Sequence, residues 1–216
     1  MRLGINCIGR QTRQFVQTVG LGWAPNTAGG RAALATFPPT RRMLVSPTVN
    51  LDAVAVERLP GAWLGYSVDD DATPAEELDD VNLACIEGAD LARAARRMFA
   101  VFPSFSRSLS HWDVMLPYCK MFTPRCNGLQ AIGDSTAYLE HLVMVRDRRP
   151  CGTQLWGEVS TAPRGTPVTL RAALAWVRTF APLVDGVWIN SPADQYYTVA
   201  GLVAALFGRT ANGGGA

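Results

Sequence analysis

The stretch Thr153-Gln-Leu-Trp-Gly-Glu158-Val-Ser160 has the pattern of a short β-strand that ends on a carboxylate. Successive side chains of a strand point to opposite faces, so Gln154, Trp156 and Glu158 share one face. All three are residue types that contact ligands. The sequence therefore predicts a strand with a ligand-contacting face and an acid at its end.

A second stretch, Trp63-Leu-Gly-Tyr-Ser-Val-Asp69-Asp70-Asp71, has the same form, an apolar strand followed by acids. Thr73-Pro74 comes next and is typical of a helix start, with Thr as the N-cap and Pro at the first helical position. On both sides of these two stretches, strand and helix patterns alternate, about eight times along the chain. Such alternation predicts a parallel sheet covered by helices.

An open doubly wound sheet and a closed barrel both satisfy this alternation. The first predicted strand is followed by Gly9-Arg10, which does not supply the Gly-rich phosphate turn of the open dinucleotide-binding form. Eight units favour a (β/α)8 barrel. The predicted fold is thus an α/β protein with one compact barrel domain over residues 1–209 and a flexible Gly-rich tail over residues 210–216.

Composition narrows the functional classes. The chain has 216 residues, 48% of them hydrophobic, and a net charge of +2 without a basic stripe, which argues against nucleic acid as a partner. It lacks a long apolar run and a cationic leader, so we expect no membrane span and a cytoplasmic location. The five cysteines fit no zinc spacing, and no metal or cofactor is indicated. We expect reduced thiols, and the alternative is a disulfide between Cys119 and Cys126 under oxidising conditions.

Parity within the predicted strands indicates which side chains point into the barrel. In the fourth strand, Leu64, Tyr66 and Val68 form an apolar face suited to the helices, which leaves Gly65, Ser67 and Asp69 inside. In the last strand, Val187 and Ile189 face the helices, and Trp188 and Asn190 point inward. The active site of such a barrel lies at the carboxyl ends of its strands, where these inward polar groups fall.

The segment Leu64-Gly65-Tyr66-Ser67-Val68-Asp69-Asp70 resembles the GYY-x-x-D-E strand-four segment of the (β/α)8 glycoside hydrolases of the large retaining clan. The resemblance implies an acid/base after strand four, at Asp70 or Asp69, and a nucleophile after strand seven, at Glu158. Trp188 corresponds to the sugar-stacking aromatic near the end of strand eight. The chain differs from the clan at Asp70, where the clan has Glu.

The leading hypothesis is a glycoside hydrolase-like barrel that binds or cleaves a glycan with two carboxyl groups. The predicted substrate-binding residues are Asn6, Gln154, Trp156, Trp188, Asn190, Arg125 and Tyr196. One alternative is a non-catalytic binding or structural module, for instance part of a phage virion or cell-surface assembly. The expected partners are a glycan or a small-molecule ligand, with a homo-oligomer or a larger assembly as a further possibility. Another is a metal-assisted hydrolase that uses Asp69 to Asp71.

Overall fold

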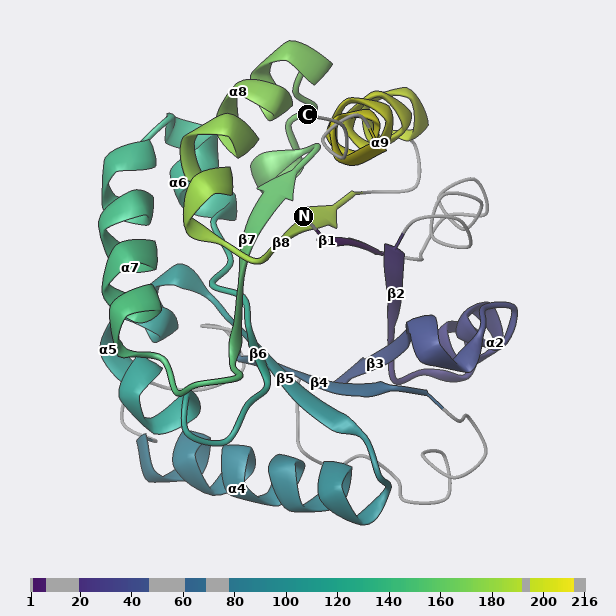
Figure 1. The fold of residues 1–216 in the computed structure, drawn as a ribbon, viewed down its shortest axis with the longest axis vertical. Helices are drawn as coiled ribbons and strands as arrows, with labels where there is room; N and C mark the ends of the chain where they lie inside the picture. Colours follow the sequence, from purple (N-terminus) through teal and green to yellow (C-terminus); the bar gives the residue numbers. More distant parts are fainter. Residues whose placement is uncertain (1, 7–19, 47–60, 69–77, 192–194, 212–216) are drawn as a thin grey trace.

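Eight parallel strands close into a barrel in the computed structural model, each strand pairing with the next and β8 pairing with β1 (Figure 1). The structure describes residues 2–6, 20–46, 61–68, 78–191 and 195–211. The strands are β1 (Arg2–Asn6), β2 (Gly20–Pro25), β3 (Arg42–Ser46), β4 (Trp63–Val68), β5 (Met98–Pro103), β6 (Met121–Phe122), β7 (Gln154–Ser160) and β8 (Gly186–Asn190). The predicted (β/α)8 barrel is confirmed.

Helices surround the barrel on its outer side (Figure 1). They are α2 (Ala28–Ala35), α4 (Leu78–Ala94), α5 (Phe105–Met115), α6 (Asn127–Ile132), α7 (Ser135–Arg148), α8 (Leu170–Phe180) and α9 (Tyr196–Ala211), with short 3-10 turns η1 (Pro39–Arg41), η2 (Pro163–Gly165) and η3 (Ala181–Leu183). The sequence also predicts helices over residues 11–19 and 51–58, and both ranges lie outside the described residues. No helix of the described part of the chain could cross a membrane.

Alternation along the strands divides the buried side chains into two cores. The outward side chains, such as Leu64, Tyr66 and Val68 of β4, pack with residues of the helices. The inward side chains form a separate cluster within the barrel: Leu21, Met43, Val45, Trp63, Ala100, Phe102, Met121, Trp156 and Trp188. The parity predicted for the described residues of strands four and eight is therefore confirmed.

Glycines make room for two tryptophans inside the barrel. A Cβ on Gly4 of β1 would lie 2.2 Å from Trp188 Cε3, and one on Gly186 of β8 would lie 2.6 Å from Trp156 Cδ2. Trp156 and Trp188 are each 2% exposed, and their ring centroids are 6.2 Å apart. The indoles fill the space that these glycines leave inside the barrel.

Helix starts differ from the sequence prediction where another residue supplies the cap. The sequence favours Ser110 as the cap of a helix after the fifth strand. Helix α5 instead begins at Phe105, because Ser104 Oγ accepts the Arg107 N–H at 3.3 Å, and Ser110 lies within the helix. The sequence also favours a helix start at Thr166, whereas Thr169 caps α8. Helix α6 was not predicted; it is one short segment that ends at Gly133, whose φ is +73°. Asp194, the residue that the sequence favours as the cap of the last helix, lies outside the described residues.

Two buried features have structural roles. Ser108 on α5 and the Nε2 atom of His141 on α7 form a buried hydrogen bond that joins the two helices. Burial lowers the pKa of His141 to about 4, so this imidazole is neutral at neutral pH. Cys119 and Cys126 are buried free thiols, so the possible disulfide is not formed.

Candidate functional site

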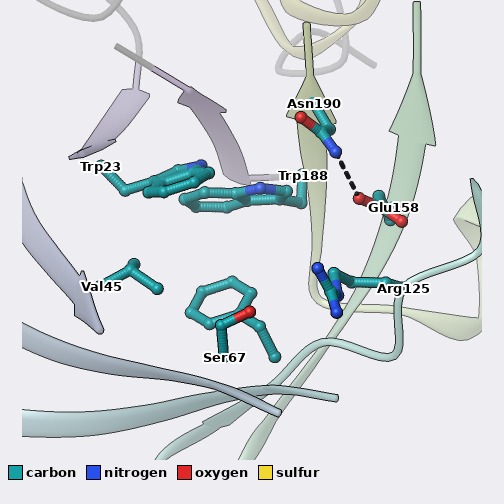
Figure 2. A pocket seen from close by; sticks show the side chains of 8 residues that line it. Trp23, Val45, Ser67, Arg125, Glu158, Trp188 and Asn190 are labelled. Carbon is teal, nitrogen blue, oxygen red and sulfur yellow. Dashed lines mark hydrogen bonds between the residues drawn. The ribbon is translucent and has the colours of Figure 1, made fainter. Parts of the chain in front are cut away.

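A pocket of about 260 Å³ lies at the carboxyl end of the barrel (Figure 2). Seven of the strands, or the residues just after them, contribute its lining: Trp23, Val45, Ser67, Phe102, Arg125, Glu158, Trp188 and Asn190. Figure 2 shows Trp23 and Trp188 along one side, Val45 and Ser67 on the opposite side, and Arg125 near Glu158. The pocket thus has an aromatic wall and a polar end.

Glu158 is the carboxyl group of the polar end, and it is only 1% exposed. Its Oε1 accepts a hydrogen bond from Asn190 Nδ2 at 3.1 Å, and its Oε2 accepts one from the backbone N–H of Cys126 at 2.6 Å. These donors fix the carboxyl group from β8 and from the turn after β6. Glu158 is therefore held in one orientation at the pocket surface.

Burial raises the pKa of Glu158 above its usual value. The positive charge of Arg125 and the hydrogen bonds from Cys126 and Asn190 act in the opposite sense, because they favour the ionised form. Arg125 is itself half-buried, and burial lowers its pKa, while the charge of Glu158 raises it. Burial on one side, and the cation and the two donors on the other, therefore act on the Glu158 carboxyl group in opposite directions.

The aromatic wall consists of rings that support one another. Trp23 and Trp188 are stacked with ring centroids 6.0 Å apart and an interplanar angle of 29°. Phe102 of β5 packs against Trp188 with a centroid distance of 5.0 Å. The indole Nε1 of Trp23 is buried and has no hydrogen-bond partner within the described part of the chain. This wall offers apolar surface together with an indole donor that has no partner among the described residues.

The structure brings together four of the predicted site residues: Glu158, Arg125, Trp188 and Asn190 all line the pocket. Gln154 and Trp156 share the inward face of β7 with Glu158 but do not line the pocket. They lie toward the start of the strand, where the Trp156 Nε1–H donates to Gln154 Oε1 at 3.0 Å.

Two other sets of predicted residues are placed elsewhere or not at all. Tyr196 begins α9 and packs edge-on against Tyr197, with ring centroids 5.5 Å apart, and it does not line the pocket. Asp69, Asp70 and the side chain of Asn6 lie outside the described residues. In the described part of the chain, no group of three His, Cys, Asp or Glu side chains could hold a metal ion.

Sequence reasoning missed the apolar residues of the pocket. Trp23, Val45 and Phe102 lie on β2, β3 and β5, and the sequence-based prediction placed no apolar residue of these strands in the site. Parity could have found Val45 and Phe102, because both alternate with side chains that face the helices. For Trp23, the signal in the sequence was its aromatic side chain on a predicted strand.

Comparison with known proteins identifies the fold only. No family model matches the sequence, and no curated protein matches it. Among solved structures, oxaloacetate acetylhydrolase is similar with a TM-score of 0.56 and 10% identity over 100% of this chain and 83% of that chain. Citrate synthase SbnG has a TM-score of 0.54 and 10% identity over 98% of this chain and 94% of that chain.

A third solved structure has a lower similarity. It is the PgaB (BpsB) glycoside hydrolase domain from Bordetella bronchiseptica, with a TM-score of 0.48 and 12% identity over 87% of this chain and 74% of that chain. The chain is thus a (β/α)8 barrel protein whose similar solved structures include enzymes. At these identities the likeness defines the fold and leaves the reaction to be inferred from the pocket.

Proposed function

We propose that the pocket binds one ring of a glycan and that Glu158 acts on the glycosidic bond as nucleophile or base. The observation that carries this proposal is a buried, oriented carboxyl group that shares a small pocket with an aromatic wall. Sugar rings have an apolar C–H face and hydroxyl groups around the edge, so they match a pocket of this composition. The other polar lining groups would bind the hydroxyls.

The size of the pocket limits the ligand. Its volume of about 260 Å³ lies just below the range typical of sites for drug-sized ligands, roughly 300–1,000 Å³. One sugar ring is the unit that we expect inside it, with the rest of the glycan outside. The Nε1–H of Trp23, which has no partner within the described residues, would donate to a hydroxyl of that ring.

The reaction needs a second carboxyl group, and the acids after β4 are the candidates. Ser67 of β4 lines the pocket, and the strand ends one residue later at Val68. Asp69 follows directly, and the alternation of Gly65 and Ser67 predicts that it points inward. In a retaining reaction, the Glu158 carboxylate would attack the anomeric carbon while Asp70 or Asp69 gives its proton to the departing oxygen. Water would then hydrolyse the resulting glycosyl ester.

A binding module without catalysis is the second candidate. Asp70 is one methylene shorter than the Glu of the glycoside hydrolase segment that it resembles, so a proton donor at this position would reach less far. A metal-assisted hydrolase using Asp69 to Asp71 is a third possibility, and loss of turnover on adding a chelator would identify it.

A panel of nitrophenyl glycosides tests the proposal and separates it from the second candidate. We expect the wild-type protein to release nitrophenol with saturable kinetics from at least one glycoside. Binding is followed separately by tryptophan fluorescence, because Trp23 and Trp188 line the pocket. Saturable quenching without release would favour the binding module. The absence of both quenching and release across the panel would rule out a glycan site.

A further inference from the structure

The hydrogen-bond ladder between β6 and β7 stops before it reaches the site. The two strands pair only through Met121 with Gln154 and Phe122 with Leu155. Pro124 follows two residues after Phe122 and has no N–H with which to continue the ladder toward β7. On its other side the chain after β6 stays bonded to β5, since the Arg125 N–H donates to Pro103 O at 2.8 Å.

A tyrosine hydroxyl occupies the place of the next ladder bond. The Gln154 N–H donates to Lys120 O at 2.9 Å. Continuing this register would direct the Glu158 N–H at Pro124 O. Instead, the hydroxyl of Tyr138 accepts the Glu158 N–H at 2.9 Å and donates to Pro124 O at 3.0 Å. Tyr138 comes from α7, is fully buried and stacks on Trp176 at a centroid distance of 5.7 Å.

Other side chains complete this edge of β7. The Glu158 carbonyl oxygen accepts hydrogen bonds from the Cys126 thiol at 3.1 Å and from Trp176 Nε1 at 3.2 Å. The amide of Gln130 pairs with the backbone of Ser160, donating to its carbonyl at 2.7 Å and accepting its N–H at 2.8 Å. Gln130 thereby imitates the peptide group of a neighbouring strand.

The opened ladder changes what the Cys126 N–H binds. In a continued ladder this N–H would donate to the Glu158 carbonyl oxygen. Here the Cys126 N–H donates to the Glu158 carboxyl oxygen Oε2 at 2.6 Å, and the Cys126 thiol donates to the Glu158 carbonyl oxygen. A backbone donor to a carboxylate is a charge-assisted hydrogen bond, which is stronger than a neutral ladder bond.

We propose that Tyr138 and Gln130 are positioning residues for Glu158. They hold the end of β7 away from the chain after β6, so that the Cys126 N–H reaches the carboxyl group and Arg125 stays beside it. The importance of this positioning for catalysis rests on the proposed function. Its effect on Glu158 itself is measurable without any substrate, which keeps the two proposals separable.

Tyr138→Phe tests the inference, because it removes the hydroxyl and keeps the stacked ring. We expect the Glu158 amide proton to exchange with solvent about tenfold faster, as for the loss of one buried hydrogen bond. We also expect the midpoint of the Glu158 carboxyl titration, followed by ¹³C NMR and assigned with Glu158→Gln, to move upward as the Cys126 donor is loosened. Tyr118→Phe is the matched control, since it removes the same hydroxyl from a half-buried tyrosine that packs at the edge of the core.

Gln130→Met is the second variant and decides the question if Tyr138→Phe does not fold. It should accelerate exchange of the Ser160 amide and also raise the Glu158 midpoint. Amide exchange and carboxyl midpoints at wild-type values in the folded variants would overturn the inference. If the wild-type protein cleaves a glycoside, Tyr138→Phe should lower kcat more than it changes KM. If it cleaves none, the proposed function fails and the titration still tests the positioning.

Discussion

Glu158→Gln is expected to lower kcat for glycoside cleavage by about 10²-fold to 10⁴-fold, with a smaller effect on binding. An amide cannot attack the anomeric carbon or accept a proton, and losses of this size are typical when a general acid or base is removed. Gln has nearly the same shape as Glu and can still accept the Cys126 N–H. The loss would therefore report the chemistry of the carboxyl group.

Glu140→Gln is the control for this substitution. Glu140 is an exposed residue of α7, so the same chemical change there should leave turnover at the wild-type value. Kinetics of both variants on the best glycoside of the panel provide the measurement. Equal kcat in Glu158→Gln and the wild-type protein would remove Glu158 from the reaction, whatever the pocket binds.

Glu158→Gln should also change how the stability of the folded protein depends on pH. Because burial raises the pKa of Glu158, the folded protein holds this proton more tightly than the unfolded chain does. Its contribution to stability is complete below the unfolded pKa, about 4.3, and is lost as pH rises through the higher folded value. Gln at this position has no proton to lose. Relative to wild type, the melting temperature of Glu158→Gln should therefore rise between pH 4 and pH 8.

Gly4→Ala is expected to produce a large loss of stability from a single methyl group. The new Cβ would lie 2.2 Å from Trp188 Cε3 and 3.0 Å from Trp156 Cζ3, both in the closed interior of the barrel. Overpacking of this kind costs about 1–3 kcal/mol, and more where neighbours cannot move. At roughly 2–4 °C per kcal/mol for a chain of this length, the melting temperature should fall by several degrees.

Gly29→Ala provides the contrasting control. A Cβ on Gly29 meets no atom within 4 Å, and the residue lies in α2. Alanine is favoured over glycine in a helix by about 1 kcal/mol, so this variant should be as stable as the wild-type protein or more stable. Similar melting temperatures for the two variants would contradict the close packing of Gly4 on Trp188.

Much of the fold was predictable because one pattern repeats along the chain. Every predicted strand is present in the barrel, since alternating and apolar runs bounded by turn residues determine strands locally. Helix starts were less predictable where several capping residues compete, as Ser104 and Ser110 do before and within α5. The choice between them depends on where β5 ends, which is a property of the barrel.

The site was predictable in its polar part. Glu158, Arg125 and Asn190 are polar residues at strand ends, and the barrel places them around one pocket. Gln154 shares a face with Glu158 but stands four residues earlier, and at about 3.3 Å per residue it lies near the opposite end of the strand. Side-chain parity identifies a face and does not give the depth along it.

The side chains that support Glu158 had no sequence signal of their own. Tyr138 lies on a helix with an ordinary pattern, and Gln130 lies on the short helix α6, which was not predicted. Both side chains bind backbone groups of β7. The nearest indication was Pro124 directly after a predicted strand, because proline cannot continue a ladder. Only the three-dimensional arrangement shows which side chain takes the vacant place.

The separation between the Glu158 carboxyl group and the nearest carboxyl group of Asp69 to Asp71, measured in a crystal structure, tests the central claim most directly. Paired-carboxylate cleavage predicts about 5–5.5 Å for a retaining reaction or about 6.5–9.5 Å for an inverting one, with both groups facing the same pocket. A separation above about 10 Å, with the aspartates outside the pocket that Glu158 lines, would contradict it.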